Sequence, residues 1–136
     1  MKLTVSKQFI ERIYGFIRAR IILLLILVLS AISIVSFIYY MLNGLGVAYN
    51  DARSHLDIAR RVIENLKPGF AQLGSVWLPL PHFLMLFTIW NDFMWHSGLS
   101  GAILSMISFV ATGALIYKFL EQIGVKLFGR IVAVLI

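Results

Sequence analysis

The sequence predicts an all-α integral membrane protein with about three transmembrane helices, the start of a fourth, and an amphipathic helix at the outer surface. Its 136 residues are 60% hydrophobic and 13% charged, whereas soluble domains average about 45–50% apolar and about 25% charged residues. The mean hydropathy is +0.91, and residues 21–42 and 98–117 contain no charged side chain. Together these observations exclude an ordinary soluble globular domain.

The basic residues point to lipid rather than to nucleic acid. The formal net charge is +6 and the pI is about 10.0. Because the Lys and Arg residues flank the apolar runs, anionic lipid headgroups are the predicted partner, and no nucleic acid is expected. The absence of cysteine excludes disulfides, thiolate chemistry and Cys-ligated zinc.

The first elements are a cytoplasmic amphipathic segment over 1–20 and a membrane span over 21–42. The span measures about 33 Å as a helix, enough to cross a hydrocarbon core of about 30 Å. A signal peptide has an apolar core of only about 7–15 residues, so a true span is favoured. Basic residues precede it and place the N-terminus in the cytoplasm: Lys2, Lys7, Arg12, Arg18 and Arg20.

Residues 43–77 form the predicted first extracytoplasmic loop. Gly44 and Gly46 indicate a turn, and an amphipathic helix is predicted over 51–67, ending at Lys67-Pro68-Gly69. One apolar stripe follows helical spacing: Ala52, Leu56, Ala59, Ile63 and Leu66. We expect this helix to lie flat on the outer membrane surface.

Further spans are predicted over 78–97 and 98–117, with the start of another over 127–136. Residues 98–117 are rich in the small residues that let helices pack closely in lipid. If 78–97 crosses the membrane, Lys118, Lys126 and Arg130 lie outside, against the positive-inside tendency. If it only dips in, they lie inside. The N-terminal charges favour the crossing. The apolar run at the end of the chain leads us to expect the first part of a longer protein.

Asp51 is the leading candidate for chemistry. At the start of a helix it is a good N-cap, and at the outer end of a span it is also placed to act as a base. His55 follows four residues later and shares its helix face. The two could orient each other, bind a ligand or form half of a metal site. His55 could equally be an interfacial histidine bonded to a neighbour.

Arginines in the same helix are candidate phosphate ligands. Arg53, Arg60 and Arg61 could hold phosphate through paired N–H groups. The alternative is ion pairing at four-residue spacing, Asp57 with Arg61 and Arg60 with Glu64. Asp92 and His96 are expected at the opposite membrane interface. No nucleophile elbow, Gly-rich phosphate loop or HExxH motif occurs, so no cofactor or metal is indicated.

The stretch "DARSHLDIARRVIENLKPGF", followed by "GSVWLPLPHFLMLF", resembles the first extracytoplasmic loop of the GT-C membrane glycosyltransferases. The similarity is greatest to the family of protein O-mannosyltransferases and the lipid A aminoarabinose transferase. It covers residues 51 to about 90. The matching positions are Asp51, His55, Ile58-Ala59-Arg60, Gly74, Trp77, Pro79 and Pro81.

The chain also departs from that family. Ala52 stands where many members have a second acid, and Leu78 replaces a usual basic residue. Family members are several times longer and have many more spans. The resemblance therefore implies the N-terminal portion of a larger GT-C fold, inactive as this chain alone.

The resemblance implies transfer of a sugar from a polyprenyl-phosphate carrier to a protein or lipid acceptor on the extracytoplasmic side, with inversion at the anomeric carbon. Asp51 would be the general base and His55 would orient it or the acceptor. Arg53 or Arg60 would contact phosphate, while Trp77 and His82 would line the pocket. Trp77 could instead be an interface anchor, and His82 could snorkel.

Two other functional classes are alternatives to the glycosyltransferase. A non-enzymatic membrane assembly subunit would use the small-residue face of 98–117 to pair with another helix. A channel or transporter is disfavoured, since no predicted span has a charge near its middle.

Overall fold

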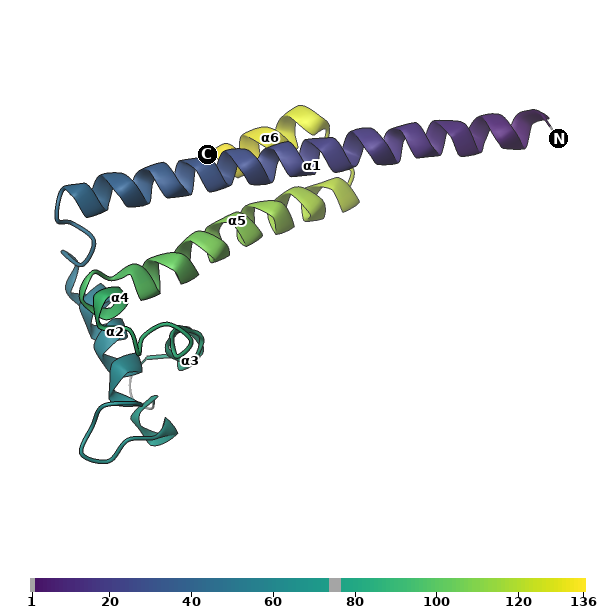
Figure 1. Ribbon diagram of the computed structural model, residues 1–136. Helices are drawn as coiled ribbons and strands as arrows, with labels where there is room; N and C mark the ends of the chain where they lie inside the picture. The colour runs from purple at the N-terminus through teal and green to yellow at the C-terminus, as the bar shows by residue number, and fades with distance from the viewer. Residues whose placement is uncertain (1, 74–76) are drawn as a thin grey trace. The chain divides into compact units, whose positions relative to one another are not determined.

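The computed structural model describes residues 2–73 and 77–136, with side chains described at Arg12 and from Gly15 onward. Over these residues the chain forms six α-helices and one short 3-10 helix, with no strand, which confirms the predicted all-α class. The α-helices (Figure 1) are α1 (Lys2–Leu42), α2 (Asn50–Arg61), α3 (Leu80–Met85), α4 (Asp92–His96), α5 (Leu99–Gln122) and α6 (Leu127–Leu135). The 3-10 helix η1 covers Phe70–Leu73.

The chain divides into two compact units. The first unit comprises Met1–Ile32 and Phe109–Ile136, and the second comprises Ser33–Ser108. Gly74, which belongs to the GT-C resemblance, lies outside the described residues.

Two helices of the described chain are long and apolar enough to cross a membrane. They are Gly15–Leu42, the greater part of α1, and Leu99–Gln122, which is α5. Large apolar side chains on α1 stay exposed, for example Leu24 at 62% and Val35 at 66%, as a lipid-facing helix requires. The predicted surface segment over 1–20 is not separate, because α1 runs without a break from Lys2 to Leu42.

The predicted span over 78–97 is not one helix. It contains α3 and α4, of six and five residues, whereas a crossing helix needs about 20 residues. The Asn91 side chain accepts a hydrogen bond from the backbone N–H of Met94 at 3.1 Å, which starts α4 as a new helix. The described residues therefore hold two helices of spanning length rather than the three that the sequence predicts.

In the first unit, α5 and α6 pack against α1, beside which α6 lies in Figure 1. The core consists of Leu25 and Leu29 from α1 and Tyr117 from α5, with Val134 of α6 packed against them. Gly113 permits the close approach, since a Cβ there would lie 2.5 Å from Leu29 Cδ1. This contact agrees with the small-residue packing predicted for 98–117.

One carboxylate joins all three helices of the first unit. Glu121, near the end of α5, pairs with Arg18 Nη2 of α1 at 2.5 Å and with Arg130 Nη1 of α6 at 2.6 Å. Arg130 also donates from Nε to the Val125 carbonyl at 2.6 Å. Arg18 and the segment 118–130 therefore lie at the same end of this unit.

The second unit is built on α2, whose Leu56 and Ala59 are buried against Met85 and Ile89. The predicted apolar stripe is therefore covered, over its first half, by the chain's own later segments. The helix ends at Arg61 rather than at residue 67. Beyond that end, Leu66 is fully exposed.

Tight backbone geometry fixes the start of α5 in the second unit. Gly98 has a φ of +79°, a left-handed conformation that favours glycine. A Cβ at Gly98 would lie 2.7 Å from Val47 Cγ1. The loop after α1 and the start of α5 can approach each other this closely only because residue 98 has no side chain.

Candidate functional site

Two histidines and a tryptophan meet in the second unit. His55 Nδ1 lies 2.7 Å from His82 Nε2, and the two rings stack with centroids 4.9 Å apart. Trp77 meets the His55 ring edge-on at 4.8 Å. The helix α2 supplies His55, α3 supplies His82, and Trp77 precedes α3. The structure thus brings together three predicted site residues that lie far apart in the sequence.

His82 is completely buried. Burial lowers its pKa, and the neighbouring His55 lowers it further. His82 is therefore neutral near pH 7 and carries one ring proton. Its Nδ1 has no hydrogen-bond partner among the described residues.

The direction of the bond between the two histidines depends on their tautomers. An orphaned buried N–H is rarer in proteins than an acceptor that lacks a donor. This favours the tautomer in which His82 carries its proton on Nε2 and donates it to His55 Nδ1. If His55 accepts at Nδ1, its proton lies on Nε2, and this outer ring nitrogen is a donor.

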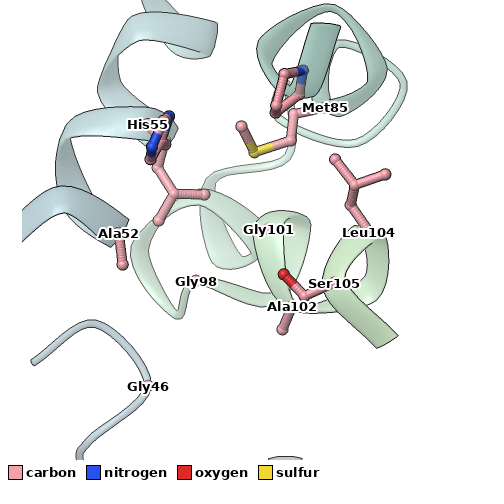
Figure 2. Close-up of a pocket in the computed structure, with 11 residues that line it drawn as sticks. Gly46, Ala52, His55, Met85, Gly98, Gly101, Ala102, Leu104 and Ser105 are labelled. Atoms are coloured by element: carbon pink, nitrogen blue, oxygen red, sulfur yellow. The ribbon is translucent and has the colours of Figure 1, made fainter. Parts of the chain in front are cut away.

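His55 also lines a cavity of about 370 Å³ between α2, the start of α3, the start of α5 and the loop at Gly46. Figure 2 shows His55 on one side and Met85 on another, with the Ser105 hydroxyl of α5 nearby. Small residues form much of the remaining wall: Gly46, Ala52, Gly98, Gly101 and Ala102. The cavity is thus mostly apolar, with His55 and Ser105 as polar groups able to contact a ligand.

Asp51 lies in the first turn of α2 but does not cap it. The N-cap is Tyr49, which makes no capping hydrogen bond with its side chain. Asp51 is not among the residues lining the cavity. Hydrogen bonding to the Asp51 carboxylate, together with its charge, raises the pKa of Tyr49. The negative charge of Asp51 in the first turn of α2 also interacts favourably with the helix dipole.

Arg53 and Asp57 belong to a second polar cluster around Trp95. The Trp95 indole Nε1 donates to Asp57 Oδ1 at 2.9 Å. Arg53 Nη2 pairs with the same oxygen at 3.1 Å, and its guanidinium lies over the indole ring at 4.8 Å. The predicted Asp57–Arg61 pair is therefore wrong, because Asp57 forms its ion pair with Arg53, four residues earlier in α2.

Arg60 is held from three directions. It donates to Glu64 through Nε at 2.9 Å, to the Ile89 carbonyl through Nη1 at 2.7 Å, and to Asp92 through Nη2 at 2.5 Å. The guanidinium also lies 4.7 Å from the centre of the Trp95 ring. Arg60 is only 6% exposed, and its pairing, first with Glu64, raises its pKa.

The Arg60–Glu64 pair was predicted from spacing, and the Arg60–Asp92 pair was not. Asp92 was expected at the opposite membrane interface, yet it contacts α2. Asn91-Asp92 is a typical helix start. This signal in the sequence could have shown that the apolar run ends before Asp92 and does not carry it across the membrane. Nothing in the local sequence pointed to Trp95 as the centre of the cluster.

In the part of the chain that the structure describes, no group of three or more His, Cys, Asp or Glu side chains could hold a metal ion. Comparisons of this chain with protein-family models, with curated proteins and with solved structures found no match.

Proposed function

We propose that this chain is the N-terminal portion of a membrane glycosyltransferase. The enzyme would transfer a sugar from a polyprenyl-phosphate carrier to an acceptor on the extracytoplasmic side. The observation that carries the proposal is the meeting of His55, His82 and Trp77. These residues come from the two separate halves of the stretch that resembles the GT-C loop. One of them, His55, lines the cavity and follows Asp51 by one helical turn.

The distribution of charge supports the orientation. The first unit contains eight of the twelve Lys and Arg residues and two of the six Asp and Glu residues. The second unit contains four basic and four acidic residues, so the entire surplus of +6 belongs to the first. The positive-inside rule counts Lys and Arg, and it places the charged end of the first unit in the cytoplasm and the loop between the two apolar helices on the extracytoplasmic side.

The ion pairs of Glu121 support two spans rather than three. Arg18 precedes most of the first apolar helix and Glu121 ends the second, and they are in contact. An even number of crossings returns the chain to its starting side. Lys118, Lys126 and Arg130 then lie in the cytoplasm, where positive charges are favoured.

In the proposed reaction, an acceptor hydroxyl attacks the anomeric carbon while the bond from that carbon to the carrier phosphate breaks. Asp51 takes the hydroxyl proton as the general base, and the polyprenyl phosphate leaves with the bonding electrons. Acceptor and leaving group occupy opposite faces of the sugar, so the configuration inverts. The carrier phosphate lies at headgroup depth, where the start of α2 follows the first span.

The remaining residues position the reactants. His55 donates from Nε2 to a sugar or acceptor oxygen, and His82 fixes the proton on that nitrogen. Trp77, 38% exposed, offers a flat apolar face to the sugar. Arg53 is the better phosphate contact, because Arg60 has its donors engaged by Glu64, Ile89 and Asp92.

The test is Asp51→Asn in the full-length natural protein. Membranes containing it are supplied with polyprenyl-phosphate-linked hexose and pentose donors, and release of free polyprenyl phosphate is measured. Loss of a base is expected to lower the rate by about 100-fold or more. Asp92→Asn is the matched control, since it makes the same change at an acid that contacts Arg60 outside the cavity.

Equal activity of wild type and Asp51→Asn, at equal expression, would contradict the proposed base. If wild type releases no polyprenyl phosphate from any of these donors, the glycosyltransferase assignment fails. The alternative is then a non-enzymatic assembly subunit that pairs through the small residues of α5.

A further inference from the structure

A second polar site lies in the first unit and has no part in the proposed reaction. It is a cavity of about 520 Å³ between α1, α5 and α6. Its charged lining residues are Arg18, Glu121 and Arg130, and its other walls include Gly15, Ile17 and Leu127. Two guanidinium groups and one carboxylate give the cavity a net charge of +1.

Glu121 holds both arginines in place. Its two carboxylate oxygens pair separately, Oε2 with Arg18 and Oε1 with Arg130. Arg130 is fixed further by its bond to the Val125 carbonyl and by stacking over Tyr117 at 5.6 Å. Arg18 pairs with Glu121, and its side chain is 55% exposed, so the guanidinium group is accessible to a ligand.

The cavity combines this charge with apolar walls. Ile17 and Leu127 are large, half-exposed side chains, and Gly15 leaves open space, since a Cβ there would meet no atom within 4 Å. A ligand that fits such a site carries a negative group for the arginines and an apolar chain for the walls. Phosphate matches the planar N–H pairs of arginine especially well.

We propose that this cavity binds the phosphate headgroup of an anionic lipid, with Arg18 as its principal ligand. The choice of the cytoplasmic leaflet rests on the membrane orientation proposed above. That leaflet is rich in anionic lipid, and the first unit carries the whole positive surplus of the chain. The binding itself does not depend on the glycosyltransferase assignment.

The experiment is native mass spectrometry of the whole chain in detergent micelles, titrated with phosphatidylglycerol or phosphatidylcholine. We expect one phosphatidylglycerol molecule to bind in preference to phosphatidylcholine. Arg18→Gln should weaken that binding about tenfold, the effect of losing hydrogen bonds between charged groups. Arg20→Gln is the matched control, because it removes the same charge from α1 at a residue that does not line the cavity.

A second variant, Gly15→Leu, leaves every charge and ion pair intact and fills the cavity. It should weaken phosphatidylglycerol binding to a similar extent while helix content, measured by circular dichroism, stays unchanged. Weakening by Arg18→Gln alone, without an effect of Gly15→Leu, would overturn the proposed cavity site.

Two further results would overturn the proposal. Equal weakening by Arg18→Gln and Arg20→Gln would mean that diffuse positive charge, rather than a site, attracts the lipid. Displacement of phosphatidylglycerol by excess inorganic phosphate would mean that the site takes free phosphate. Retention of the lipid under excess phosphate supports a lipid ligand, because the apolar chain then contributes to binding.

Discussion

His82 and Arg60 are both buried polar residues of the second unit, yet they differ in how well their polar atoms are paired. Arg60 donates to two carboxylates and a backbone carbonyl, whereas His82 leaves Nδ1 without a partner among the described residues. A satisfied buried cation holds neighbouring segments together. A half-satisfied buried histidine is costly to the fold, and the described hydrogen bond of the His82 side chain is the one to His55.

The stability of the second unit should depend on pH through His82. Its pKa in the folded chain is lowered by burial, while a histidine in an unfolded chain has a pKa of about 6.5. Between these values the unfolded chain binds more protons than the native one, so stability rises with pH. Acidification from neutral pH should lower the free energy of unfolding by up to about 1.4 kcal/mol per pH unit in this window.

Denaturant unfolding in micelles, followed by tryptophan fluorescence, measures this effect. All three tryptophans lie in the second unit, so the signal reports that unit. His82→Phe should flatten the dependence on pH below about 6.5, and His96→Phe, which changes an exposed histidine, should leave it in place. An unchanged slope in His82→Phe would assign the pH dependence to other groups.

The sequence predicts most residues of the candidate site but not which of them are in contact. His55, Trp77 and His82 were chosen from spacing and resemblance, and the structure brings them together. Asp51 was chosen for its place at a helix start, but it lies outside the cavity lining. The contact of Trp95 with Asp57 joins residues 38 positions apart, and local spacing carries no information about such pairs.

At the scale of elements, Gly113 sets the distance between α5 and α1. Gly113→Leu should destabilise the first unit by about 1–2 kcal/mol, because overpacking costs about 1–3 kcal/mol and the better helix propensity returns up to about 1 kcal/mol. The side chain would collide with Leu29 Cδ1 and Val134 Cγ1. Unfolding followed by far-ultraviolet circular dichroism measures the loss.

Ala111→Leu provides the comparison for this substitution. Ala111 lies on the exposed side of the same helix, so a leucine there adds bulk without a collision. Its stability should match that of wild type. Equal stability of Gly113→Leu and wild type would show that the helices can separate without loss.

The long helices were easier to predict than the short ones. Uncharged runs at 21–42 and 98–117 correspond to α1 and α5, because length and hydropathy alone determine such helices. The run at 78–97 has a similar composition, but Asn91 starts a new helix within it. Met85 and Ile89 are buried against α2, so their apolar character serves the packing of the second unit.

At the scale of the whole molecule, the number of membrane crossings determines on which side of the membrane each exposed segment lies. With two spans, Ser54 and Phe93 lie outside and Lys126 lies inside. With the three spans expected from sequence, Phe93 would lie inside and Lys126 outside. The contact of Asp92 with Arg60 supports the two-span arrangement.

Single cysteines distinguish the two arrangements, since the chain has no cysteine of its own. On intact cells, a membrane-impermeant maleimide should label Ser54→Cys and Phe93→Cys. It should label Lys126→Cys only after the cells are opened. All three residues are exposed, so lack of reaction reports the side of the membrane. Labelling of Lys126→Cys on intact cells would contradict two spans.

The balance of charge within the second unit affects how the chain enters an energised membrane. Moving one charge through the membrane potential involves about 2.3 kcal/mol per 100 mV. With four cations and four anions, the second unit can be exported with no net electrical work. The surplus cations of the first unit would have to move against an inside-negative voltage to follow it. In the proposed orientation, export of the loop between the two apolar helices is therefore electrically neutral, and the voltage opposes inversion of the finished protein.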